Sequence, residues 1–203
     1  MHTTQTNLLI EVKDSQNREA WGRFYRIYAP MLRHFAHRMG LSETDAEDLA
    51  QEVLIIVHRA LQNNVYEKAK GSFRAYLYGI ARRQALAALR HRNRPTRFQF
   101  VGPEDGISLI DQVADRHSEE MLQTLWEEEW RRALLSEALL HVRAEVSDKV
   151  FQAFLLYFVQ NKPVEEVAGQ LQLAPASVYV YKARIETALK EWVAKFEERE
   201  NGP

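Results

Sequence analysis

Apolar side chains recur every three or four residues along most of the chain, which is the spacing of one face of an α-helix. Stretches in which apolar and polar residues alternate, the pattern of a half-buried strand, are nearly absent. The fold is therefore predicted to be all-α. Helices are expected over residues 17–39, 42–62, 73–92, 118–145, 148–160, 164–171 and 176–196.

The helical pattern stops in the middle of the chain. Residues 95–117 contain several prolines and glycines and show no helical periodicity, which is typical of a connecting segment. The sequence thus predicts two small helical domains, residues 10–94 and 118–197, joined by an extended linker at residues 95–117.

The last two predicted helices have the lengths and the tight connection of a helix-turn-helix, in which the second helix enters the major groove of DNA. An ordinary antiparallel helix pair explains the same spacing equally well. Gln172 stands in the turn where a residue that tolerates positive φ, commonly glycine, is expected, and this counts against the motif.

Composition excludes several classes of protein. The 203-residue chain has no cysteine, so disulfide frameworks, thiolate zinc sites and thiol nucleophiles are ruled out. It has no apolar run of membrane-spanning length, and its first residues lack the pattern of a signal peptide, so a cytoplasmic protein without membrane insertion is expected.

The formal net charge of -1 hides a strong separation of charge along the chain. Residues 71–97 contain seven arginines and no carboxylate, whereas residues 43–52 contain five carboxylates and no lysine or arginine. This separation predicts one surface for a polyanion and another for a cationic partner. The aromatic side chains among the arginines favour nucleic acid, because they offer stacking faces to bases.

No catalytic or cofactor motif is present. His34 and His37 have the spacing of a metal-ligand pair, but the neighbouring Arg33 and Arg38 and the lack of a third ligand argue against a metal. Nucleophile elbows, phosphate loops and dinucleotide fingerprints are missing as well, so neither an enzyme nor a cofactor is predicted.

Three sequence motifs together resemble a known family. They are DAEDLAQE at residues 45–52, GSFRAYLYGIAR at residues 71–82, and EEVAGQL at residues 165–171 followed by Ser177 and Val178. In this order they resemble bacterial RNA polymerase sigma factors of the sigma-70 family, specifically the extracytoplasmic-function (ECF) type. The resemblance extends from about residue 10 to residue 197.

The resemblance implies a non-enzymatic transcription initiation factor that binds core RNA polymerase, recognises the -10 and -35 promoter elements and helps to open the DNA. The implied contacts with the polymerase beta-prime clamp coiled coil are Asp48, Gln51 and Glu52. The implied -10 contacts are Lys68, Lys70, Phe73, Arg74, Tyr76, Arg82, Arg83 and Arg90. The implied -35 contacts are Ser177, Tyr179, Tyr181, Lys182 and Arg184. The family also implies contact with the polymerase beta flap and an anti-sigma factor as a further partner.

Some positions depart from the usual ECF pattern. Tyr76, Arg83 and Ala87 stand where the family usually has Trp, Asn and Asp. In the expected recognition helix, Tyr179 and Tyr181 replace basic residues. Tyr181 is expected to face DNA on a stripe with Ser177 and Arg184. For Tyr179, contact with DNA and packing in the core explain the pattern equally well. Because tyrosine cannot form the paired hydrogen bonds that arginine makes with guanine, the -35 preference is expected to depend less on guanine than is usual in the family.

The alternative interpretation is a free-standing helix-turn-helix regulator. Such a protein has no need for an exposed acidic face at Asp48, Gln51 and Glu52, so binding to core polymerase discriminates between the two classes.

Overall fold

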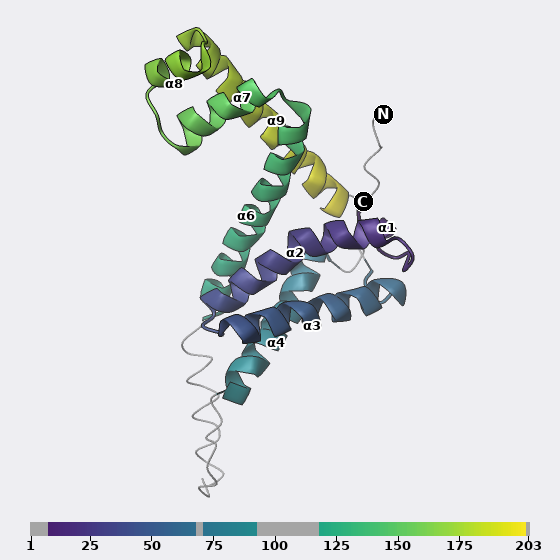
Figure 1. The fold of residues 1–203 in the computed structure, drawn as a ribbon. Coiled ribbons are helices and arrows are strands. Elements are labelled where there is room, and N and C mark those ends of the chain that lie inside the picture. Colours follow the sequence, from purple (N-terminus) through teal and green to yellow (C-terminus); the bar gives the residue numbers. More distant parts are fainter. Residues whose placement is uncertain (1–7, 68–70, 93–117, 202–203) are drawn as a thin grey trace, which may run out of the picture. The chain divides into compact units, whose positions relative to one another are not determined.

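The computed structural model describes residues 8–67, 71–92 and 118–201, and every regular element in these ranges is a helix (Figure 1). The all-α prediction is confirmed. The predicted linker at 95–117 lies outside the described residues. The elements are α1 (Leu8–Glu11), α2 (Arg18–Arg38), α3 (Glu43–Gln62), α4 (Phe73–Arg92), α6 (Glu119–Glu145), α7 (Asp148–Phe154), the π-helix η2 (Leu155–Val159), α8 (Val164–Leu171) and α9 (Pro175–Asn201).

The described part of the chain forms two compact units, which divide between Ala133 and Leu134, inside α6. The sequence pattern assigned the whole of this helix to the second domain, so the observed division differs from the expected boundary at residue 118. The reason is that the apolar side chains of the first half of α6 are buried in the first unit. These side chains are Leu122, Trp126 and Trp130.

In the first unit, α2 and α3 lie side by side, and α4 packs against α3 (Figure 1). Local sequence signals set the helix ends. The side chain of Asn17 accepts a hydrogen bond from the Ala20 N–H and caps α2, and Ser42 caps α3 in the same way through the Asp45 N–H. Gly40, at φ +91°, lies in the short connection between α2 and α3.

Aromatic rings form the centre of this unit. Phe73, the first residue of α4, has no exposed surface and lies 5.8 Å from Phe24 and 5.5 Å from Tyr28, measured between ring centroids. Tyr66, from the segment before α4, adds an edge-on contact with Phe73 at 5.6 Å. The start of α4 is therefore anchored by its own first side chain.

The second unit contains the second half of α6, α7, η2, α8 and α9. Two apolar clusters hold it together. One joins α6, α7 and α9 through Ala138, Val142, Val150, Phe154, Ile185 and Leu189. The other joins α7, α8 and α9 through Ala153, Val164, Val167, Ala168 and Val178.

A three-residue turn connects α8 to α9. Its first residue, Gln172, adopts the left-handed conformation at φ 52°, ψ 57°, and the Leu173 N–H donates to the Ala168 carbonyl at 2.8 Å. The predicted tight turn therefore forms with glutamine, not glycine, at the left-handed position, so Gln172 does not exclude the turn of the motif. Packing of Val167, Ala168 and Val178 offsets the conformational cost.

Alanine substitution at two glycines is expected to change stability in opposite directions. Gly40 has positive φ and Gly79 lies inside α4, and an added Cβ meets no atom within 4 Å at either site. Gly40→Ala should lower the free energy of unfolding by about 1 kcal/mol through backbone strain. Gly79→Ala should raise it by about 0.5–1 kcal/mol. Urea unfolding measures both, and the same sign for both variants would contradict the assignment.

Candidate nucleic-acid interface

Helix α4 carries an apolar face and two polar stripes. Its apolar face is buried in the first unit and consists of Phe73, Leu77, Ile80, Ala81, Ala85 and Leu89. The first polar stripe, defined by Arg74, Tyr78 and Arg82, has the four-residue spacing of one helix face. The second polar stripe, defined by Tyr76, Arg83 and Arg90, repeats every seven residues on a different face.

The first polar stripe contacts α6. Arg82 forms an ion pair with Glu119 (Nη2–Oε2 2.7 Å), and the Tyr78 hydroxyl donates a hydrogen bond to Glu119 (2.7 Å). Arg74 pairs with Glu127. Burial, followed by the hydrogen bond to Glu119, raises the pKa of the Tyr78 hydroxyl well above its usual value. Two of the predicted -10 contacts, Arg74 and Arg82, are therefore engaged within the protein.

The second polar stripe remains at the surface. Arg83 and Arg90 are exposed and Tyr76 is half-buried. The Arg83 guanidinium donates from Nε to the Gly79 carbonyl at 3.2 Å, one turn earlier in the same helix. This stripe therefore presents cations and one aromatic ring to a ligand in solution.

A cavity of about 320 Å³ opens beside the second polar stripe. It is lined by Val65, Tyr66, Glu67, Gly71, Ser72, Ala75 and Tyr76. The Tyr66 hydroxyl donates to the Gly71 carbonyl at 3.2 Å, and the rings of Tyr66 and Tyr76 lie 5.1 Å apart. These contacts place two neighbouring aromatic rings in the wall of the cavity. A planar ring that stacks on tyrosine fits this chemistry.

Sequence reasoning missed the wall residues of this cavity before α4. Val65 and Tyr66 belong to a segment that the pattern identified only as a loop, and the aromatic side chain next to a basic stretch was the available signal. The predicted contacts Lys68 and Lys70 lie outside the described residues.

The predicted role of Phe73 in DNA contact is corrected. Its side chain is completely buried among Phe24, Tyr28 and Tyr66, so no ring face is open to a base. As the first residue of α4 it follows the helical apolar face, and the interleaving of aromatic and basic residues did not distinguish buried rings from exposed ones.

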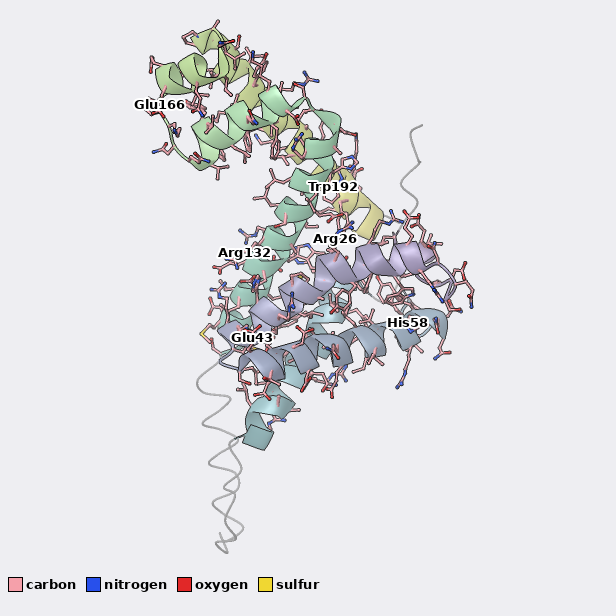
Figure 2. All side chains as sticks on the ribbon, in the orientation of Figure 1. Arg26, Glu43, His58, Arg132, Glu166 and Trp192 are labelled. Carbon is pink, nitrogen blue, oxygen red and sulfur yellow. The ribbon has the colours of Figure 1, made fainter. Side chains whose placement is uncertain are left out.

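The acidic face of α3 is exposed as the sequence predicts. Asp48, Gln51 and Glu52 lie at the surface, away from the buried residues of the same helix, and Ile55, 49% exposed, continues this face. Another carboxylate of this segment is engaged elsewhere: Glu43, labelled at the start of α3 in Figure 2, pairs with His37 of α2 (2.6 Å).

Glu47 is also engaged within the protein, because its carboxylate accepts a hydrogen bond from the Gln51 amide at 3.4 Å. The Arg33 guanidinium donates to its carboxylate at 2.9 Å and holds the pKa of Glu47 below its usual value. Asp48 and Glu52, with Gln51 between them, are the carboxylates of this face for which the described residues provide no ion pair.

In α9 the structure reverses the expected orientation of one tyrosine. Tyr181 is partly buried and packs against both apolar clusters of the second unit, so the prediction that it faces DNA is wrong. Val178, Tyr181 and Ile185 follow the spacing i, i+3, i+7, which is the buried face of a helix. Tyr181 therefore lies on the buried face of α9 together with Val178 and Ile185, whereas the sequence pattern placed only the two aliphatic residues there.

Tyr179 is 51% exposed and touches the ring of Tyr157 edge-on at 5.5 Å. Its proximity to Tyr157 raises the pKa of the Tyr179 hydroxyl. Of the remaining predicted -35 contacts, Arg184 is exposed, Ser177 is half-buried, and Lys182 pairs with Glu186 (3.1 Å) and lies 5.4 Å from the Phe158 ring.

Truncation of the two tyrosines is expected to separate their roles. Tyr181→Ala should lower the free energy of unfolding by about 2–3 kcal/mol, because it empties a position shared by two apolar clusters. Tyr179→Ala should cost less than about 1 kcal/mol. Chemical unfolding followed by circular dichroism measures both values, and equal decreases would place Tyr181 outside the core.

The described part of the chain shows neither a metal site nor a membrane span. It contains no group of three or more His, Asp or Glu side chains that could hold a metal ion. None of its helices is both long and apolar enough to cross a bilayer.

One comparison with known proteins bears on this site. Residues 24–95, which run from α2 through α4, match the family model described as Sigma-70 region 2. The match includes the acidic face of α3, both polar stripes of α4 and the cavity beside them.

Proposed function

We propose that this chain is a sigma factor of the ECF type. The match of residues 24–95 to Sigma-70 region 2 supports membership of the sigma-70 family and a role in transcription initiation. Its partners are core RNA polymerase and promoter DNA, and its family is non-enzymatic. In this proposal the chain directs polymerase to particular promoters through -10 and -35 elements and aids DNA opening.

The observation that carries the proposal is the cavity beside the second polar stripe of α4. We assign the cavity, with its walls of Tyr66 and Tyr76, to an unstacked base of the -10 element. Arg83 and Arg90 then meet the neighbouring phosphates, since both guanidinium groups are exposed on the same stripe. Lys68 and Lys70, which lie outside the described residues, complete the proposed -10 contacts.

Core polymerase is assigned to the acidic face of α3. Asp48, Gln51 and Glu52 are exposed together, and Ile55 adds an apolar contact beside them. A charged face with one apolar side chain suits a basic protein surface such as the beta-prime clamp coiled coil.

The second unit is assigned to the -35 element and the polymerase beta flap. Support comes from the tight turn between α8 and α9 and from the exposed positions of Tyr179 and Arg184 near the start of α9. Tyr179 takes over the expected thymine-methyl contact from Tyr181, so a -35 preference with less dependence on guanine remains part of the proposal. Ser177 and Lys182 complete the proposed contacts. An anti-sigma factor is a further proposed partner.

The alternative of a free-standing regulator is not favoured. A Sigma-70 region 2 domain implies interaction with core polymerase, which such a regulator does not need. Run-off transcription with core polymerase over a random promoter library, with and without the chain, tests the proposal. Initiation at a selected set of sequences only when the chain is present is the expected result.

Substitutions on the acidic face of α3 should weaken polymerase binding without unfolding the protein. For Asp48→Ala and Glu52→Arg we expect binding to weaken by about 2–5 kcal/mol, because an interfacial charge pair is broken. Stability should change by no more than about 0.5 kcal/mol, since both side chains are exposed.

Affinity for core polymerase is measured by fluorescence anisotropy of the labelled chain. Glu19→Arg, at an exposed position of α2, is the control and should bind normally. Normal binding by both α3 variants would contradict the docking assignment.

The second polar stripe should contribute a salt-dependent term to DNA binding. Arg83→Ala combined with Arg90→Ala is expected to reduce the slope of log K against log salt by about 0.7–0.9 for each phosphate that the variant no longer neutralises. The measurement uses holoenzyme and a promoter selected from the library. Arg18→Ala with Arg131→Ala removes two exposed arginines from α2 and α6 and is the matched control. An equal change of slope in both double variants would assign the effect to net charge alone.

A further inference from the structure

We propose that the first half of α6 is an intramolecular competitor of DNA, which occupies Arg74 and Arg82 on the first polar stripe of α4 until DNA displaces it. This inference rests on the proposed function, because it needs α4 to bind promoter DNA. It adds a regulatory contact that covers one of the two polar stripes and leaves the other exposed.

The charges of the two helices match in register. Glu119 pairs with Arg82 and Glu127 pairs with Arg74, so the helices run in opposite directions at this contact. The glutamates are eight residues apart, as are the arginines, which is a rise of about 12 Å along each helix. Tyr78, midway between the two arginines, adds its hydrogen bond to Glu119. Equal spacing allows both ion pairs to form together.

Two tryptophans hold α6 over the first polar stripe. Trp126 is buried and lies 5.3 Å from Phe35 of α2 and 5.6 Å from Tyr78 of α4. Trp130 is also buried, and the Arg74 guanidinium lies 5.4 Å from the centroid of its ring. The arginine thus lies between a carboxylate and an aromatic face, which are favourable neighbours for its charge and for its planar surface.

A second group of charges fixes α6 on α2. Glu129 is only 1% exposed, and it accepts hydrogen bonds from Arg132 (2.7 and 2.8 Å) and from Arg38 of α2 (3.3 Å). Arg38 also pairs with Glu128, which raises the pKa of the guanidinium and lowers that of the carboxylate. Arg132 is labelled on α6 in Figure 2. Because α2 receives these contacts, Glu119 and Glu127 can be neutralised without disrupting this attachment.

Carboxylate and phosphate compete for the same donors. Both anions accept paired hydrogen bonds from the planar edge of a guanidinium, so an arginine held by glutamate must be released before it binds phosphate. The second polar stripe carries no such cover, since Arg83 and Arg90 are exposed. DNA is therefore expected to engage the second polar stripe first and the first polar stripe only after α6 moves.

The contact is suited to release. Arg82 and Glu119 keep 37% and 47% of their side-chain surface exposed, and ion pairs so open to water are weak. Helix α4 does not need α6 to keep its place, because its apolar face is buried against other parts of the first unit, Phe73 against Phe24 and Tyr28. Opening breaks these ion pairs, the Arg38 contacts with Glu128 and Glu129, and the burial of Leu122, Trp126 and Trp130. Phosphate contacts with the first polar stripe must therefore offset all of these losses.

The first test measures DNA affinity of the full-length chain. The probe is a random single-stranded oligodeoxynucleotide of about 30 nucleotides, followed by fluorescence anisotropy at low salt. Glu119→Gln with Glu127→Gln keeps the shape of both side chains and removes their charge. It should bind the probe about fivefold or more tightly than wild type, because the open form is more populated.

The control must remove the same charge elsewhere. Glu19→Gln with Glu191→Gln changes two exposed glutamates, in α2 and α9, for which the described residues provide no ion pair. Its affinity should rise less than about twofold. Equal affinity of both double variants, including no measurable binding by either, overturns the inference.

The second test observes α6 directly. A chain with Trp21→Phe and Trp192→Phe retains Trp126 and Trp130 as its emitters. On saturation with the oligodeoxynucleotide, their emission should shift to longer wavelength, and quenching by acrylamide should increase, as both rings leave their buried positions. Binding of DNA with both rings still protected overturns the inference.

Failure here is distinguishable from failure of the proposed function. If wild type and both double variants direct run-off transcription equally while the tryptophans stay protected, the sigma factor role stands and the competition by α6 is overturned. If the chain neither binds core polymerase nor directs initiation, the proposed function itself fails.

Discussion

The burial of one face of α4 is the constraint on which the candidate interface depends. Phe73 has no exposed surface, and its contacts with Phe24, Tyr28 and Tyr66 hold the first turn of the helix. Once this face is fixed, the helical repeat decides where every other side chain of α4 points. One polar stripe then meets α6, and the other borders the cavity at Tyr66 and Tyr76.

The fixed orientation of α4 also determines which of its arginines meet carboxylates, in a chain whose net charge is -1. Residues 71–97 contain no carboxylate of their own, but α6 supplies Glu119 and Glu127 from outside that segment. The arginines of the first polar stripe are thus neutralised by tertiary contact, and those of the second are left for a polyanion. Counting charge along the sequence cannot separate the two groups, because they alternate within the same few turns.

In the second unit, packing overrides two local expectations. Gln172 takes a left-handed conformation that usually favours glycine, and neighbouring apolar contacts offset the cost. The segment expected as one helix over residues 148–160 becomes α7 followed by the π-helix η2, where the Gln160 N–H donates to the Leu155 carbonyl at 2.9 Å. The spacing of apolar residues predicts neither the left-handed conformation of Gln172 nor the π-helix η2.

The sequence by itself determined the helical class, most helix positions and the exposed acidic face, because these follow from local periodicity, capping residues such as Ser42 and the separation of Asp48 and Glu52 from the apolar stripe. Only the tertiary structure decided which aromatic rings are buried. Phe73 and Tyr181 both continue the apolar spacing of their helices, but each also stands next to a basic residue, so the pattern did not separate a buried ring from one that faces DNA. The division of α6 between two units, and the pairing of Arg74 and Arg82 with its glutamates, likewise arise from contacts between residues more than 30 positions apart. No pattern along a single helix records such contacts, because the partner lies in another part of the chain.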